Sequence, residues 1–144
     1  MSETKWIAGA ATSLLTTQLN ALADGGISAL GTEYDNATNL YLFGDFQLDV
    51  DFVSAPTVNL PVALYIVPAL DGTNYGFGSA SAVWAGYNRG GWSMIASTAQ
   101  QVLTIQGIPL PPLKFKIQVK NSSGQAMPAT GTTVKLVPYR YQSA

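Results

Sequence analysis

The sequence predicts an all-β fold, an antiparallel jelly-roll-like β-sandwich of about seven or eight strands with at most one short helix near the N-terminus. Residues 38–52 and 113–120 alternate between apolar and polar side chains with the period of two that marks a strand. Residues 61–68 form a short apolar run bracketed by prolines, which suits a strand and excludes a helix interior. Long first and last strands around a long irregular excursion favour a jelly roll over an immunoglobulin fold.

A length of 144 residues suits a single domain, which we divide into an N-terminal segment at 1–37 and a β-sandwich at 38–144. Within the segment we expect a short helix over residues 13–23. Ser13 is a potential N-cap and Asp24-Gly25-Gly26 is a stop signal. An extended conformation is the alternative for Leu14–Leu19. The leucines that share one helical face are Leu14, Leu15, Leu19 and Leu22.

The clearest strand covers residues 38–52, and its even positions are expected to enter the core. Gly44 interrupts this strand and predicts a bend or a β-bulge. The odd positions carry acidic residues and are expected to meet solvent or a partner. The even, apolar positions are Leu40, Leu42, Phe46, Leu48, Val50 and Phe52.

Residues 61–68 are apolar on both faces, so both faces of this strand should be covered. We expect the cover to come from the N-terminal segment or from a neighbouring subunit. Residues 101–106 predict another strand, and the prolines at 109, 111 and 112 make the connection after it stiff and irregular.

The last two strands are predicted at 113–120 and 132–141, with a turn at Asn121–Gly124 between them. The first of them alternates without error between apolar and polar positions. In the second, the apolar parity changes between Leu136 and Val137, which predicts a bulge or a change of face.

Two rows of charged residues match in period and are opposite in sign. One lies on the strand predicted at 38–52 and the other on the strand predicted at 113–120. Such rows can pair across neighbouring strands, or they can face each other across a subunit boundary and set its register. The acidic row is Asp45, Asp49 and Asp51, and the basic row is Lys114, Lys116 and Lys120.

The Gly-rich excursion at 71–98 is also rich in aromatic residues. Three interpretations stay open: the rings plug the open end of the sandwich, contact a subunit or other partner, or stack on sugar rings. In the last two, Arg89 is expected to add a polar clamp. The candidate partner or glycan contacts are Trp84, Tyr87, Arg89 and Trp92, in an excursion that also holds Tyr75 and Phe77.

The composition argues against catalysis. The chain has no histidine and no cysteine, which excludes thiolate nucleophiles and the commonest general base. On an ideal strand the Cα atoms of Asp49 and Asp51 are about 6.6–6.8 Å apart, and paired carboxylates at such spacing can serve glycoside hydrolysis. Nothing nearby, however, predicts a raised pKa for either carboxylate. The sequence therefore predicts a binding and assembly module, not an enzyme, with neither cofactor nor metal.

Charge and hydropathy restrict the partners. The net charge of −1 argues against a nucleic-acid backbone, and no apolar stretch reaches the ~20 residues needed to span a membrane. Only 10% of the residues are charged, whereas about 25% is usual. A surface so poor in charge favours a protein that covers itself with partners.

The order of motifs from Leu40 to Tyr141 resembles the jelly-roll capsid decoration (cement) proteins of tailed bacteriophages. The residues that carry the resemblance are Leu40–Phe46, Leu60–Pro68, Gly107–Lys116, Asn121–Gly131 and Val134–Tyr139. The resemblance implies a virion structural protein that stabilises a phage head by bridging capsomers on its outer face. It implies a homotrimer, contact with the major capsid protein, synthesis in the host bacterial cytoplasm, and no catalytic residues.

Two further expectations accompany this resemblance. Residues 1–12 and the stiff Pro109–Pro112 segment are expected to act as arms that reach a neighbour or the capsid. The alternative function is a carbohydrate- or receptor-binding jelly-roll module of a phage tail or fibre. In that alternative Trp84, Tyr87 and Trp92 form the binding platform.

Overall fold

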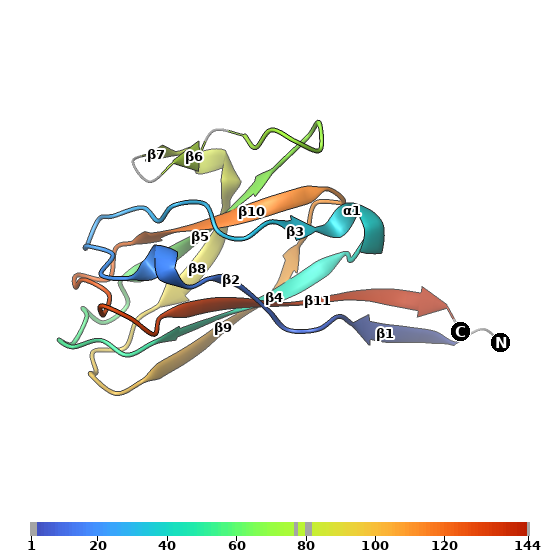
Figure 1. Cartoon of the computed structure of the whole chain (residues 1–144). Helices are drawn as coiled ribbons and strands as arrows, with labels where there is room; N and C mark the ends of the chain where they lie inside the picture. Colours follow the sequence, from blue (N-terminus) through green and yellow to red (C-terminus); the bar gives the residue numbers. More distant parts are fainter. Residues whose placement is uncertain (1–2, 77, 80–81, 144) are drawn as a thin grey trace.

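Two antiparallel sheets packed face to face form the body of the molecule in a computed structural model, which describes residues 3–76, 78–79 and 82–143 (Figure 1). The first sheet contains β1 (Thr4–Ala8), β2 (Thr12–Leu15), β4 (Phe43–Val50), β9 (Gln101–Pro109) and β11 (Thr133–Ser143). The second contains β3 (Tyr34–Asp35), β5 (Pro61–Pro68), β8 (Asn88–Ser93) and β10 (Lys114–Asn121). The remaining short elements are η1 (Thr17–Leu19), α1 (Asn36–Asn39), the β6 (Gly78–Ser79) and β7 (Ala82–Val83) hairpin, and η2 (Ala85–Tyr87).

The strand order confirms the predicted jelly roll. In the first sheet β2, β11, β4 and β9 are neighbours in that order, and in the second sheet the order is β3, β10, β5 and β8. The chain passes from one sheet to the other at every connection among these eight strands except the one from β5 to β8. Eight strands wound in this way form the double Greek key of a jelly roll. β1 extends the first sheet alongside β11.

The core lies between the sheets and follows the alternation read from the sequence along β10 and from Phe46 onward in β4. Leu40 and Leu42, predicted to enter the core, precede β4 and are 52% and 49% exposed. Phe46, Leu48 and Val50 of β4 are buried, and so are Phe115, Ile117 and Val119 of β10.

The bulge predicted at Gly44 lies instead on the partner strand: Gln106 and Gly107 of β9 together oppose Asp45, with Gly107 at φ +69°, while β4 stays in register with β11. A Cβ at position 44 would lie 2.4 Å from Leu136 Cδ1, so the close approach there also needs glycine.

The strand predicted from residue 38 begins later, at Phe43. Asp35 caps the four-residue helix α1 by accepting a hydrogen bond from the Ala37 backbone N–H at 3.0 Å. The buried Asn36 side chain then bonds to the Tyr41 backbone and to the Pro111 carbonyl, each at 2.8 Å. These local bonds make the chain turn where the sequence pattern predicted an extended strand.

The helix predicted over residues 13–23 is wrong. Thr12–Leu15 form β2, which pairs with β11, and only the single turn η1 follows. Leu14 and Leu15 are both buried although they are adjacent. Pairing with a distant strand, which the local periodicity does not encode, overrides the helical pattern. Since β1, β2 and β3 belong to the sheets, the boundary placed at residue 37 does not separate an arm from the sandwich.

The change of face predicted after Leu136 is also wrong. Val134, Leu136 and Pro138 are all buried, and β11 keeps one continuous register with β4 from Thr133 to Tyr139. Pro138 occupies an inward position as an apolar core residue, which leaves Val137 on the outer face. The register of β11 shifts instead against β2, between Val134 and Lys135.

The outer face of β5 is covered by the chain itself. Tyr65 and Val67 point away from the core and are nevertheless buried. Residues 70–76 and 82–87 cross over this face, as Figure 1 shows above β5 and β10. The Gly76 N–H donates to the Pro68 carbonyl at 3.2 Å, and η2 contacts β5. The cover predicted to come from the N-terminal segment or a neighbouring subunit therefore comes from this excursion. On the adjacent strand β10, the Ser28 carbonyl of the N-terminal segment accepts a hydrogen bond from Gln118.

Candidate binding surfaces

The aromatic residues predicted as one contact platform lie in different places. Trp92 belongs to the core, where it is 2% exposed and its Nε1–H donates to the Phe46 carbonyl at 3.1 Å. Trp84 is 59% exposed and packs edge-on against Tyr87, with ring centroids 5.0 Å apart. Phe77 lies outside the described residues. The three-ring platform of Trp84, Tyr87 and Trp92 is therefore wrong, and a two-ring surface remains.

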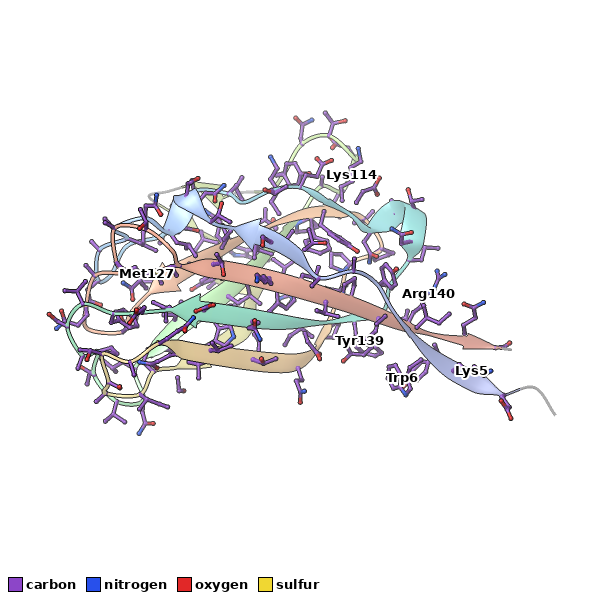
Figure 2. The ribbon with its side chains drawn as sticks, turned by 60° about the horizontal axis from the view of Figure 1, so that its bottom comes forward. Lys5, Trp6, Lys114, Met127, Tyr139 and Arg140 are labelled. Atoms are coloured by element: carbon purple, nitrogen blue, oxygen red, sulfur yellow. The ribbon has the colours of Figure 1, made fainter. Side chains whose placement is uncertain are left out.

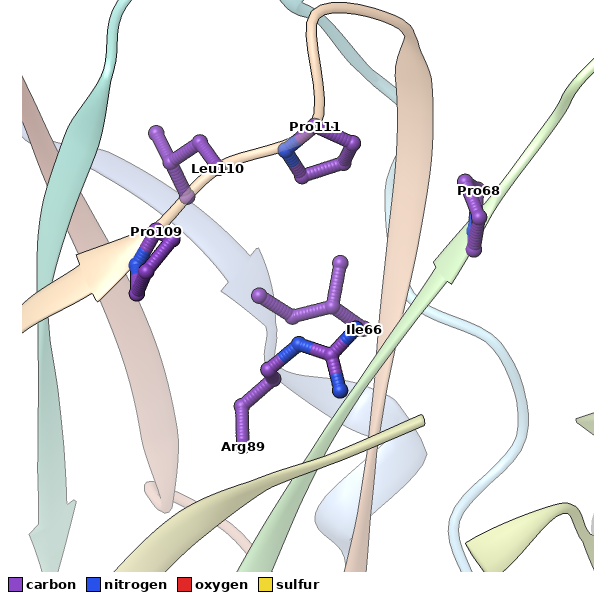
Figure 3. A pocket seen from close by; sticks show the side chains of 6 residues that line it. All are labelled: Ile66, Pro68, Arg89, Pro109, Leu110 and Pro111. Carbon is purple, nitrogen blue, oxygen red and sulfur yellow. The ribbon is translucent and has the colours of Figure 1, made fainter. Parts of the chain in front are cut away.

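Arg89 follows the turn that carries these rings and lines a pocket at the mouth between the two sheets (Figure 3). The guanidinium donates from Nη1 to the backbone carbonyls of Gly86 and Asn88, at 3.0 and 2.9 Å. The polar clamp predicted for Arg89 concerns a bound partner or sugar, and it stays a prediction.

The two charge rows lie on opposite outer faces of the sandwich. β4 is in the first sheet and β10 is in the second, so the rows cannot pair across neighbouring strands of one chain. Asp45 accepts a hydrogen bond from the Gly107 N–H, and Asp49 accepts one from Gln100. A pairing between subunits stays a prediction for the full set of Asp45, Asp49, Asp51, Lys114, Lys116 and Lys120.

The basic row helps to hold the excursion in place. Lys114 Nζ lies 3.6 Å from Glu33 Oε1, and Lys116 Nζ lies 4.4 Å from the centre of the Tyr75 ring. The Tyr75 hydroxyl donates a hydrogen bond to Glu33. This bond, followed by the nearby lysines, lowers the pKa of Glu33, whereas desolvation and Glu33 raise the pKa of Tyr75. The cluster ties residues 70–76 to the second sheet.

The first sheet, in contrast, continues beyond the sandwich as a two-stranded ribbon. We define the ribbon as β1 together with Tyr139–Ser143 of β11. β4 pairs with β11 only up to Tyr139, so residues 140–143 of β11 pair with β1 alone. The ribbon carries both chain ends away from the core, as Figure 1 shows at its right. Its outer backbone edges are unpaired among the described residues.

Four aromatic rings form a row from the ribbon onto the first sheet. The ring centroids of Trp6 lie 4.0 Å from Tyr141 and 5.2 Å from Tyr139, and Tyr139 lies 5.9 Å from Phe43. Trp6 is 59% exposed and Tyr141 is 48% exposed. Figure 2 shows Trp6 and Tyr139 on one side of the ribbon and Arg140 on the other. We call this set (Phe43, Tyr139, Trp6 and Tyr141) the aromatic row.

A shallow groove of about 530 Å³ runs beside the aromatic row, lined by Trp6, Ala8, Gln106, Gly107 and Tyr139. Gly107 adopts φ +69°. Desolvation, followed by the Asp45 carboxylate, raises the pKa of Tyr139. The arrangement offers flat apolar rings next to an amide and a hydroxyl, which is a surface for binding.

Sequence reasoning missed the aromatic row. Tyr139 and Tyr141 have the i, i+2 spacing that places both on one strand face, and this signal was available. Trp6 joins them only because β1 pairs with β11 across almost the whole length of the chain.

The described residues contain no group of three or more acidic, histidine or cysteine side chains that could hold a metal ion. None of their helices has the length and hydropathy required to cross a bilayer.

Comparisons with known proteins add little to this description. No family model matches the chain, and no curated protein matches it. Among solved structures, the chain is similar to the N-terminal cellulose-binding domain of β-1,4-glucanase C from Cellulomonas fimi, at 11% identity and a TM-score of 0.28. The similarity covers 96% of this chain and 88% of that one. The class of protein is thus defined by the chain's own strand order, a jelly-roll β-sandwich with an aromatic ribbon.

Proposed function

We propose that this chain is a virion structural protein, a capsid decoration protein that acts by binding to a phage head and not by catalysis. The observation that supports the proposal best is the ribbon, which projects past the core and exposes Trp6 and Tyr141. Tryptophan and tyrosine dominate the residues whose truncation weakens protein interfaces most. An exposed pair of large rings with unpaired backbone edges beside it is suited to a protein partner.

In this proposal the ribbon contacts the major capsid protein. Exposed apolar rings gain roughly 25 cal/mol for each Å² of apolar surface that leaves water, so each single contact is modest. Binding at many symmetry-related positions of an icosahedral head multiplies such contacts and bridges neighbouring capsomers. The small number of charged residues favours dense packing of copies on that surface.

Self-association, with a homotrimer as the proposed state, would bring the acidic row of one copy to the partly exposed lysines of the basic row on the next. Because the two rows lie on opposite faces, this contact is head-to-tail. Head-to-tail contacts form a ring such as a trimer where the rotation from copy to copy closes, and an open filament where it does not. A homotrimer whose stability is unchanged between low and high ionic strength would contradict this role of the charge rows.

The test of the ribbon is binding to purified heads that lack decoration, measured by co-sedimentation and by copy number in mass spectrometry. We expect Trp6→Ala to weaken binding by at least tenfold while leaving the circular dichroism spectrum unchanged. Trp84→Ala is the matched control, because Trp84 has the same exposure of 59% and lies on the excursion. Equal binding by Trp6→Ala and the parent protein would overturn the ribbon as the contact. Binding of neither protein to heads would overturn the function.

A second candidate function is carbohydrate recognition by a tail or fibre module, and the groove beside the aromatic row favours it. Aromatic faces stack on the apolar faces of sugar rings, and the Gln106 amide and Tyr139 hydroxyl supply directional hydrogen bonds. This candidate requires saturable glycan binding that Trp6→Ala abolishes and Trp84→Ala leaves intact. Strong glycan binding without any binding to heads would favour it over decoration.

A further inference from the structure

A β-bulge at the start of β8 turns one arginine toward the space between the two sheets. Asn88 pairs with Tyr65 and Gly91 pairs with Ala63, so Arg89 and Gly90 together oppose Leu64. Gly90 has φ +98°, a conformation that favours glycine. Leu64 is a core residue, and the strand position opposite it faces inward. Bulges commonly redirect a side chain next to a functional site.

The pocket that Arg89 enters is small and otherwise apolar. It has a volume of about 250 Å³. Figure 3 shows the guanidinium next to Ile66 and across from the end of β9 and the start of the β9–β10 connection. The other lining residues are Ile66, Pro68, Pro109, Leu110 and Pro111, so Arg89 is the single charged group among them.

The far wall of the pocket is held rigidly. The Leu110 N–H donates to the Leu42 carbonyl at 3.0 Å, and the buried Asn36 side chain donates to the Pro111 carbonyl at 2.8 Å. The two prolines of this wall have fixed φ angles and little conformational freedom to lose on binding. A wall of this kind binds an apolar group at low entropic cost.

The guanidinium of Arg89 is held in place by two hydrogen bonds and has further N–H groups that can donate to a ligand. Two bonds from Nη1 to the carbonyls of Gly86 and Asn88 fix its position. A guanidinium has five N–H donors, so Nε and Nη2 still offer three. The ion pairs among the described residues are Lys5–Glu3 and Lys114–Glu33, and neither involves Arg89. The pocket therefore presents a cation, held by two hydrogen bonds, that no carboxylate among the described residues neutralises.

We propose that this pocket binds a carboxylate joined to a compact apolar group, with the carboxylate on Arg89 and the apolar group against Pro109, Leu110 and Pro111. A planar guanidinium matches the two oxygens of a carboxylate. Inorganic phosphate is a poorer fit, because it would leave the apolar wall uncovered. The volume lies just below the ~300–1,000 Å³ of typical ligand pockets, so the apolar group is about the size of one side chain. The site is separate from the ribbon and independent of the proposed function.

Methyl NMR spectroscopy tests the proposal with N-acetyl-leucine as the probe and N-acetyl-leucine amide as its uncharged counterpart. We expect the acid to shift the methyl signals of Ile66 and Leu110 saturably, and the amide to bind at least tenfold more weakly. Arg89→Gln should weaken binding of the acid at least tenfold, and Arg89→Lys should weaken it less. Arg89 is exposed, so neither substitution should prevent folding.

Arg140→Gln is the matched control, because Arg140 is the other arginine of the chain and also donates to a backbone carbonyl, that of Asn39. It should leave binding unchanged. Equal binding of acid and amide, or undiminished binding by Arg89→Gln, would overturn the proposal.

A further comparison of ligands in the same NMR measurement identifies the source of the carboxylate. A peptide that ends in leucine is compared with the same peptide amidated at its C-terminus and with N-acetyl-leucine. Tighter binding of the free-acid peptide than of N-acetyl-leucine assigns the pocket to a polypeptide C-terminus. Equal binding of the two assigns it to small organic acids.

Discussion

The outer faces of the two sheets differ in what covers them. The second sheet is covered by residues 70–76 and 82–87 of its own chain, and Tyr65 and Val67 are buried beneath them. The first sheet has no such cover among the described residues, and its aromatic row remains exposed. The sequence predicted cover for β5, which is apolar on both faces, and an acidic outer face for β4, but it did not predict that apolar rings on the first sheet stay uncovered. The comparison teaches that an apolar outer face is an interaction surface only where the chain does not cover it.

The largest expected effect is a difference in the free energy of unfolding between substitutions at two outward-facing valines, Val67 and Val137. Val67 on β5 is fully buried by the excursion, whereas Val137 on β11 is half-exposed. Val67→Asp should lower the free energy of unfolding by about 3–5 kcal/mol, because it places an unpaired charge under the cover. Val137→Asp should lower it by less than about 1 kcal/mol.

Urea denaturation of the two variants measures this difference. A Val67→Asp variant as stable as Val137→Asp would mean that residues 70–76 and 82–87 do not cover the second sheet in solution.

A smaller effect concerns the cluster that ties down the excursion. Tyr75→Phe removes the hydroxyl that donates to Glu33. The bond from the Gly76 N–H to the Pro68 carbonyl should then open more often, and this amide should exchange with solvent about two- to tenfold faster. Tyr141→Phe on the ribbon is the control and should leave that rate unchanged. An equal exchange rate of the Gly76 amide in the parent protein, Tyr75→Phe and Tyr141→Phe would show that the Tyr75–Glu33 hydrogen bond does not hold the excursion in place.

The smallest effect is a local response to acid within the excursion. The Asp71 carboxylate accepts bonds from the backbone N–H of Asn74, the Asn74 side chain and the Thr73 N–H, and they lower its pKa from 3.8 to about 2. Since the folded pKa is depressed, the stability that this carboxylate adds to its turn is present above about pH 4. It is lost as the pH falls towards 2.

NMR titration of the Thr73 and Asn74 amide signals should follow the pKa of about 2. In Asp71→Asn these signals should not titrate in that range. The ribbon amides of residues 4–8 should show no transition at this pKa, and an equal response there would show that the acid effect is not local to the excursion.

Strand positions were predictable wherever one face meets the core and the other does not. The limits predicted for 61–68 agree with β5, and those for 113–120 differ from β10 by one residue at each end. Prediction failed where a local preference competes with distant pairing. Leu14 and Leu15 have helical spacing with Leu19, yet β11 draws residues 12–15 into the first sheet. The strand predicted from residue 38 was wrong for the opposite reason, since local hydrogen bonds of the Asn36 side chain interrupt an alternating pattern.

The candidate surfaces were predictable only in part. Trp84 and Trp92 had the same three open interpretations, because both occur in the same Gly-rich stretch with weak periodicity, and only the structure places Trp92 in the core and Trp84 on the surface. The bulge that turns Arg89 inward depends on its pairing with β5, a strand more than twenty residues earlier.

The sequence by itself determined that this protein is an all-β jelly roll without histidine or cysteine chemistry, because alternation and composition are properties of short segments. Only the tertiary structure decided which apolar residues stay exposed. Trp6 meets Tyr139 and Tyr141 through β1 and β11, at opposite ends of the chain, and Val67 is buried by an excursion that its own strand does not encode. The physical reason is that burial depends on which distant segments pack together, and the local pattern fixes only the face to which each side chain points.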